Sequence, residues 1–164
     1  MNFNLTEQQQ QIVDQVREFT AQRLAPGVLE RDEQQVFPVE AFKEFGAMGM
    51  FGLCYPKEFG GTDVGHLPYI LAVEEVSKVD SSFGIGFSVN TSLYGGSVMY
   101  SSATDEQKKR FLSPIASGKA IGSFGLTEAS AGSDAAGQKT IATKDGDDYI
   151  LNGTKIFNTN GPPG

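Results

Sequence analysis

The first residues of the chain repeat apolar side chains at helical spacing. Residues 6–26 carry an apolar face, with polar side chains filling the opposite face. Thr6 is followed three residues later by Gln9, which is the sequence pattern of a capping box at a helix start. We therefore predict an amphipathic helix over residues 6–26. The positions that define its apolar face are Ile12, Val16 and Phe19.

Four further segments have helical character, at 38–50, 67–79, 82–101 and 104–118. The segment 82–101 is almost free of charge and apolar on all sides, which is typical of a helix inside a bundle. Thr104 precedes acidic and then basic residues, an order that suits the helix macrodipole. The connections are mostly short, so these segments predict an all-α bundle. The apolar stripes of the second and third helices are Phe42, Phe45 and Met48, then Ile70, Val73 and Val76.

The pattern changes after Gly118. Residues 120–128 have strand character, and residues 138–144 and 148–161 alternate as strands do. The intervening "DGDD" predicts a hairpin turn centred on Asp145-Gly146. These strands begin a sheet and leave an open edge that further strands would pair.

Together, the two patterns predict a mainly α protein. About five helices form an N-terminal bundle over residues 1–118, and the first strands of an incomplete antiparallel β domain occupy residues 119–164.

Composition narrows the classes of function. The 164 residues include 20 acidic and 13 basic side chains, and this net charge of −7 argues against nucleic-acid binding. The start lacks the basic and apolar pattern of a secretion signal, and no apolar stretch is long enough to cross a bilayer. Cys54, the single cysteine, sits among apolar neighbours and is expected to act as a buried small hydrophobe. We expect a cytoplasmic protein without membrane or nucleic-acid partners.

Two later stretches contain the candidate chemistry. In "FGLTEASAGSDAAG", residues 124–137, Gly132 allows close backbone approach and Thr127 and Ser133 offer hydroxyl groups. This stretch matches neither the Rossmann nor the P-loop pattern, so a polar loop and a cradle for a phosphorylated cofactor both remain open. In "LNGTKIFNTNG", residues 151–161, Phe157 can stack on a planar cofactor or pack in a core.

Taken together, "LTEASAGSD" and "YILNGTKIFNTNG" resemble the paired signatures of the acyl-CoA dehydrogenase family. Four further stretches are similar to that family and follow in the same order, so the resemblance covers nearly the whole chain up to "GPPG". The short-chain, butyryl-type branch is the most similar. The four stretches are "NFNLTEQQQQIVDQVREF", "FGLCYPKEFGG", "AVEEVSKVDSS" and "ATDEQKKRFLSPIASG".

The resemblance implies a flavoprotein oxidoreductase of fatty acid metabolism. Family members have an N-terminal helical domain, a middle β domain and a C-terminal four-helix domain, with FAD between the last two. They catalyse the α,β-dehydrogenation of an acyl-CoA thioester in β-oxidation and pass electrons to an electron-transferring flavoprotein. A dimer or tetramer is implied for the full-length enzyme.

The resemblance also implies roles for individual residues. Thr127 corresponds to a threonine that hydrogen-bonds the flavin ring, and Ser133 to a serine that meets both the cofactor and the acyl-CoA. Phe157 falls where an aromatic packs on the isoalloxazine. The implied cofactor-binding residues are Phe124, Leu126, Thr127, Gly132, Ser133, Phe157 and Thr159. The implied substrate-binding residues are Ser133, Val89, Asn90, Leu93 and Tyr94, the last four as the wall of the acyl-chain cavity.

The sequence departs from the family pattern at two positions. Ala129 replaces a usual proline, and Asn158 replaces a usual apolar residue. In the short- and medium-chain branches the catalytic base is a glutamate of the C-terminal domain, so we assign no catalytic residue here, and no metal site. Glu128, although inside the motif, is not at the family's base position. We expect this chain alone to be inactive. A non-catalytic helical interaction module and a flavin oxidase on the same fold are the alternatives.

Overall fold

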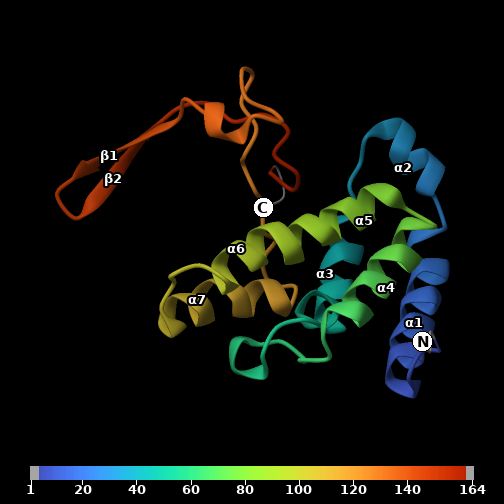
Figure 1. Ribbon diagram of the computed structural model, residues 1–164. Helices are drawn as coiled ribbons and strands as arrows, with labels where there is room; N and C mark the ends of the chain where they lie inside the picture. Colours follow the sequence, from blue (N-terminus) through green and yellow to red (C-terminus); the bar gives the residue numbers. More distant parts are fainter. Residues whose placement is uncertain (1–3, 162–164) are drawn as a thin grey trace.

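The computed structural model describes residues 4–161. Figure 1 shows helices packed together through most of the chain and a β hairpin that projects away from them. The mainly α architecture followed by the start of an antiparallel β region is therefore confirmed. The helices are α1 (Glu7–Phe19), α2 (Val28–Gln34), α3 (Val39–Ala47), α4 (His66–Ser77), α5 (Ser81–Ser88), α6 (Gly96–Met99) and α7 (Asp105–Ala116). The strands are β1 (Ile141–Asp145) and β2 (Asp148–Asn152).

The capping box at the start of α1 is confirmed. The Thr6 hydroxyl accepts a hydrogen bond from the Gln9 amide at 3.3 Å, and the Gln9 side chain accepts one from the Thr6 amide at 2.9 Å. A wider, π-helical turn over Thr20–Leu24 then continues the helix. Asn2 and Phe3, which open the family-like sequence at this end, lie outside the described residues.

The sequence patterns missed α2. This helix lies between Gly27 and Gln35, whose φ angles of 73° and 57° place both in the left-handed region. It has no fully buried residue. A helix without a buried face leaves no apolar periodicity in the sequence, and for this reason its residues did not stand out.

The uncharged segment forms one continuous helical run. Asp80 caps α5 by accepting a hydrogen bond from the Phe83 amide at 2.9 Å. A π-helical stretch over Val89–Gly95 then joins α5 to α6. The Tyr55 hydroxyl donates to the Thr91 carbonyl within this stretch, and such wide turns leave carbonyls that need partners. The predicted range 82–101 agrees with the helical run to within two residues at each end.

Aromatic side chains dominate the core. The Phe45 ring lies 5.1 Å from the Phe87 ring and 5.5 Å from the Phe83 ring, both in edge-on geometry. All three side chains are fully buried. Cys54 is partly buried, and this burial raises the pKa of its thiol above the usual range. The cysteine packs against a hydrophobic cluster, as expected, but it is less buried than the sequence indicated.

Two expectations about helix faces are wrong. Met48 and Ile70, which the periodicity placed on apolar stripes, have exposed side chains. Glu75, which is not among the apolar positions predicted for its helix, is buried. The guanidinium of Arg17 on α1 donates two hydrogen bonds to the Glu75 carboxylate, at 2.8 and 3.1 Å, and lowers its pKa. The pairing allows a carboxylate to lie at the α1–α4 contact, which sequence periodicity alone does not predict.

The β region contains one hairpin. Thr143 pairs with Ile150 in its register, and the two-residue turn is Gly146-Asp147, with Gly146 at a φ of 61°. The turn is therefore one residue later than predicted. The expected strand over 120–128 and the continuation of the last strand beyond Asn152 are not strands, because their backbones pair through isolated hydrogen bonds. Pro162–Gly164 lie outside the described residues. Within residues 4–161, no helix combines the length and apolar character needed to cross a membrane.

Candidate functional site

The two motif segments lie side by side in the structure. The Ile156 amide donates a 2.8 Å hydrogen bond to the Thr127 carbonyl, and the Ser123 hydroxyl donates to the Thr159 carbonyl at 2.9 Å. Figure 1 shows these two segments running together above the helices, between the helical body and the hairpin. Residues 123–127 and 155–159 thus form one face, although about 30 residues separate them in sequence.

Glu128 ties this face together. Its buried carboxylate accepts hydrogen bonds from the Lys155 ammonium at 2.9 Å and from the Thr140 hydroxyl at 2.6 Å. The backbone amides of Lys139 and Thr140 donate two more, at 2.7 and 3.0 Å. The Lys155 ammonium, followed by the other donors, lowers the pKa of Glu128 to about 2.

Phe157 presents its ring to solvent. The side chain is 85% exposed, and its backbone has a φ of 57°, which is uncommon for an aromatic residue. It is therefore not a core residue at the hairpin end. Leu126 on the adjacent segment is also exposed, whereas Phe124, Thr127 and Thr159 are half-buried. The face consequently combines an apolar ring with nearby hydroxyl groups.

Gly132 and Ser133 lie in an exposed loop just beyond this face. The turn just before them is closed by reciprocal backbone hydrogen bonds of 3.1 Å between Glu128 and Ala131. A methyl group added at Gly132 would meet no atom within 4 Å, so a ligand could reach its backbone. The two departures from the family pattern, Ala129 and Asn158, are exposed and bury no polar group.

The candidate acyl-chain wall meets the motif face at Gly122. The Asn90 side-chain carbonyl accepts from the Gly122 amide at 2.7 Å, and the Asn160 side chain donates to the carbonyls of Gly86 and Gly122 at 2.9 and 3.0 Å. A methyl group added at Gly122 would lie 2.6–2.8 Å from the Tyr94 side chain. The sequence analysis did not identify Gly122 and Asn160, because their hydrogen bonds join segments that are far apart in the sequence.

The four candidate wall residues do not share one environment. Val89 and Asn90 are buried, Tyr94 is half-buried and Leu93 is 45% exposed. The Asn90 amide nitrogen is buried and has no hydrogen-bond partner. The structure therefore brings Asn90 and Tyr94 to the motif segment and leaves Val89 within the helical packing. Their role as an acyl-chain wall stays a prediction.

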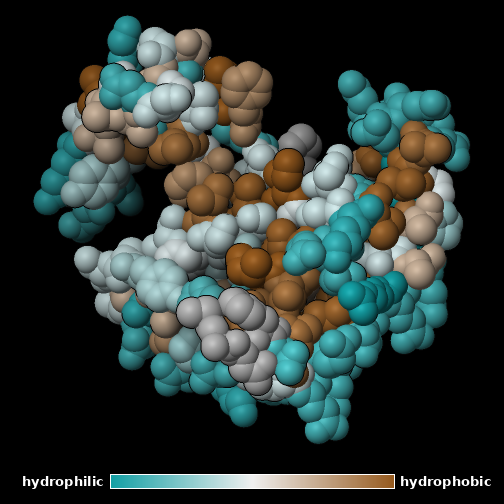
Figure 2. Space-filling model, turned by 45° about the vertical axis from the view of Figure 1, so that its right-hand side comes forward, coloured by the Kyte–Doolittle hydropathy of each residue, from teal (hydrophilic) through white to brown (hydrophobic). Residues whose placement is uncertain are grey.

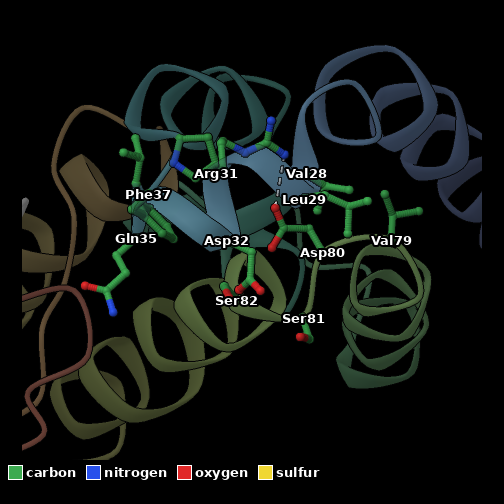
Figure 3. A pocket seen from close by; sticks show the side chains of 12 residues that line it. Val28, Leu29, Arg31, Asp32, Gln35, Phe37, Val79, Asp80, Ser81 and Ser82 are labelled. Atoms are coloured by element: carbon green, nitrogen blue, oxygen red, sulfur yellow. Dashed lines mark hydrogen bonds and ion pairs between the residues drawn. The ribbon is translucent and has the colours of Figure 1, made fainter.

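A groove of about 610 Å³ lies elsewhere, between α2, the α2–α3 link, the α4–α5 link and the start of α5. Figure 3 shows Arg31 and Asp80 pairing across it; their ion pair is 3.2 Å long. The Arg31 guanidinium also donates to the carbonyls of Leu24 and Pro26. Because Arg31 is committed to these internal partners and no predicted site residue lines the groove, we do not assign the candidate site to it.

Figure 2 shows apolar surface, in brown, gathered over the middle of one face of the helical body, with polar surface around it. The loop and hairpin region at the upper left of that view has a mixed surface. Exposed apolar side chains thus occur on both parts of the chain. Those of the helical part include Leu29, Leu67, Ile70 and Ile85, and those of the β region include Ile141, Tyr149, Leu151 and Phe157.

The residues present fit a planar, phosphorylated cofactor. The exposed Phe157 ring offers a stacking surface, and the half-buried hydroxyl-bearing Thr127 and Thr159 lie on paired segments beside it. Gly132 and Ser133 add open backbone and a hydroxyl, groups that suit a phosphate. Among residues 4–161, no group of His, Cys, Asp and Glu side chains is arranged to hold a metal ion.

Comparison with known proteins places these residues in a wider context. Residues 6–119 match the model of the acyl-CoA dehydrogenase N-terminal domain, and residues 123–163 match that of the middle domain. A short-chain specific acyl-CoA dehydrogenase of Clostridium acetobutylicum is 45% identical over 161 residues, covering 98% of this chain. The chain spans 42% of the length of that relative.

Two solved structures are similar over nearly the whole chain. Butyryl-CoA dehydrogenase from Megasphaera elsdenii is 42% identical with a TM-score of 0.93, over 99% of this chain and 43% of that one. A glutaryl-CoA dehydrogenase from Mycobacterium smegmatis in complex with FADH2 is 40% identical with a TM-score of 0.90, over 97% of this chain and 41% of that one.

Proposed function

Because the chain belongs to the acyl-CoA dehydrogenase family, we propose that it forms part of an FAD-dependent enzyme that dehydrogenates a short-chain acyl-CoA thioester between Cα and Cβ. The observation that carries this proposal is the pairing of Ile156 with Thr127 at 2.8 Å. It brings the two family signatures onto one face, where they can contact the same ligand.

Each residue of the face has a proposed part. Thr127 and Thr159 would hydrogen-bond the flavin ring, and Phe157 would pack against it. The Gly132–Ser133 loop would meet the pyrophosphate, and the Ser133 hydroxyl would also meet the acyl-CoA. These residues would hold FAD, which would supply the acceptor for the hydride that leaves Cβ. The chain's own contribution is to orient the ring and to keep its donors fixed.

The acyl chain would lie along the π-helical stretch. Asn90 and Tyr94 are the wall residues that reach the motif segment through Gly122. Apolar lining would exclude water from the reacting carbons, which favours removal of a weakly acidic α-proton. Leu93 would complete the proposed wall, and Val89, buried within the helical packing, would support it from behind.

Glu128 is not a suitable base for this reaction. A general base works best with a pKa near the operating pH, and the pKa of Glu128 is lowered to about 2 by donors that occupy its carboxylate. The family resemblance implies a glutamate base in a C-terminal domain, whereas the matched domains are the N-terminal and middle ones. An electron-transferring flavoprotein as acceptor, a dimer or tetramer, and a cytoplasmic location belong to this proposal.

We expect no catalysis from the isolated chain. Supplied with FAD, a short-chain acyl-CoA and an electron-accepting dye, it should give no dye reduction above FAD alone, because the proton-abstracting base is not among the matched domains. A dye-reduction assay measures this, with a short-chain specific relative as the positive control. Dye reduction that depends on both the chain and acyl-CoA would contradict the proposed inactivity.

A further inference from the structure

Glu128 joins three segments that are far apart in sequence. Its carboxylate sits at the end of the Thr127 segment, accepts from the backbone and hydroxyl of the segment that leads into β1, and pairs with Lys155 beside Phe157. Only 7% of Glu128 is exposed, and the Lys155 side chain is 23% exposed. A buried carboxylate with four donors is a fixed junction, since each donor would be costly to leave unpaired.

Lys155 also makes a second contact, with the backbone that precedes Glu128. Besides the Glu128 carboxylate, its ammonium donates to the Leu126 carbonyl at 3.0 Å. Gln138 also donates to that carbonyl, at 2.8 Å. The two donors hold the backbone just before Thr127. The next residue after Lys155 is Ile156, whose amide makes the 2.8 Å bond to the Thr127 carbonyl.

We propose that Glu128 and Lys155 form a latch that positions Thr127 against Phe157 and Thr159, so that Glu128 is a positioning residue of the site and not its base. That this alignment serves FAD binding rests on the proposed function. The latch itself is a feature of the chain without cofactor and can be tested there. Removing it should loosen residues 155–159 from residues 124–127 and leave the helical core intact, because Glu128 and Lys155 are not members of the core cluster and their described hydrogen bonds go to residues outside it.

The test measures hydrogen exchange of the Ile156 amide by NMR in the free chain, at neutral pH. The variants are Glu128→Gln, which removes the charge, Lys155→Met, which removes the ammonium, and Lys155→Arg, which keeps a cation. We expect the Ile156 protection factor to fall about tenfold or more in the first two, since a charge-assisted bond holds the segments together. Lys155→Arg is expected to keep most of the protection.

Two controls separate alignment from general stability. Glu44→Gln removes a carboxylate that pairs with Arg23 on the helical part, and it should leave Ile156 protection unchanged. The amide of Val16, buried in α1, should keep its protection in every variant. Unchanged Ile156 protection in Glu128→Gln and Lys155→Met would overturn the inference. An equal loss at Val16 would also overturn it, because Glu128 would then support the whole fold.

The pH dependence of Ile156 protection gives a second readout. A contribution of Glu128 that did not depend on its charge would not produce this dependence. The charged side chain facing the Glu128 carboxylate is Lys155; the other donors, from Thr140 and the Lys139 backbone, are neutral. The pKa of Glu128 is lowered from 4.5 to about 2 in the folded chain, so the latch is at full strength above pH 4.5 and is lost as pH falls through about 2.

Ile156 protection in the wild-type chain should therefore follow this acid transition, and Glu128→Gln should show none at that residue. A wild-type profile that matches Glu128→Gln throughout would contradict the latch. No cofactor is present in these measurements, so failure of the proposed FAD function would leave their outcome readable.

Discussion

Phe45→Ala is expected to lower the free energy of unfolding of the helical part by about 3–5 kcal/mol. Phe45 is fully buried, and four other phenylalanine rings lie with their centroids within 6 Å of its own. Truncation removes apolar contacts and leaves a cavity that the surrounding rings, fixed on three different elements, cannot fill. The measurement is chemical denaturation followed by helical circular dichroism. The surrounding rings are Phe19, Phe51, Phe83 and Phe87.

Ile85→Ala is the matched control. Ile85 lies on α5 between Phe83 and Phe87, but its side chain is 58% exposed. The substitution should change the free energy of unfolding by about 0.5 kcal/mol or less, as is usual for surface positions. Equal effects of the two substitutions would show that the aromatic cluster is not the core of the folded chain.

Gly122→Ala is expected to lower the free energy of unfolding by about 1–3 kcal/mol, because the added methyl group has no room. It would lie 2.6–2.8 Å from three atoms of the Tyr94 side chain, one of them the Cβ, which cannot swing away. The Gly122 amide donates to Asn90 and the Gly122 carbonyl accepts from Asn160, so a shift of this backbone would break hydrogen bonds. Denaturation and exchange of the Gly122-region amides measure the effect.

Gly96→Ala provides the comparison for this substitution. Gly96 opens α6, and an added methyl group would have only Tyr100 at 4.0 Å. Alanine is a better helix former than glycine, so this change should stabilise the chain by about 0.5–1 kcal/mol. If Gly96→Ala destabilised the chain as much as Gly122→Ala, the effect at Gly122 could not be attributed to close packing against Tyr94.

Local sequence signals predicted the helices that have a buried face, and they marked the start of those that also carry a side-chain cap. Thr6 with Gln9 marked α1, and Thr104 marked α7, because caps use residues three positions apart. Helix α2 was not predicted, because none of its residues is fully buried and its sequence therefore shows no apolar periodicity. The burial of Glu75 was also missed, because it depends on Arg17, which is 58 residues away.

The candidate site was only partly predictable for the same reason. Its hydroxyls, glycine and aromatic ring are visible in two short motifs, and the structure places those motifs side by side. The contacts that hold the motifs in place are not visible in the sequence. They are the ion pair of Glu128 with Lys155 and the hydrogen bonds of Asn90 and Asn160 to Gly122. Each contact joins residues at least 27 positions apart, beyond the reach of periodicity and turn rules.

The most direct measurement is flavin reduction in a chimera. The segment of the Clostridium acetobutylicum short-chain specific acyl-CoA dehydrogenase that aligns with 98% of this chain is replaced by the chain itself. Flavin absorbance is then followed on adding a short-chain acyl-CoA, with the unaltered relative as control. The account predicts a yellow protein whose flavin is bleached by the acyl-CoA. A chimera with the relative's circular dichroism that holds no flavin, or holds flavin that acyl-CoA does not reduce, would contradict it.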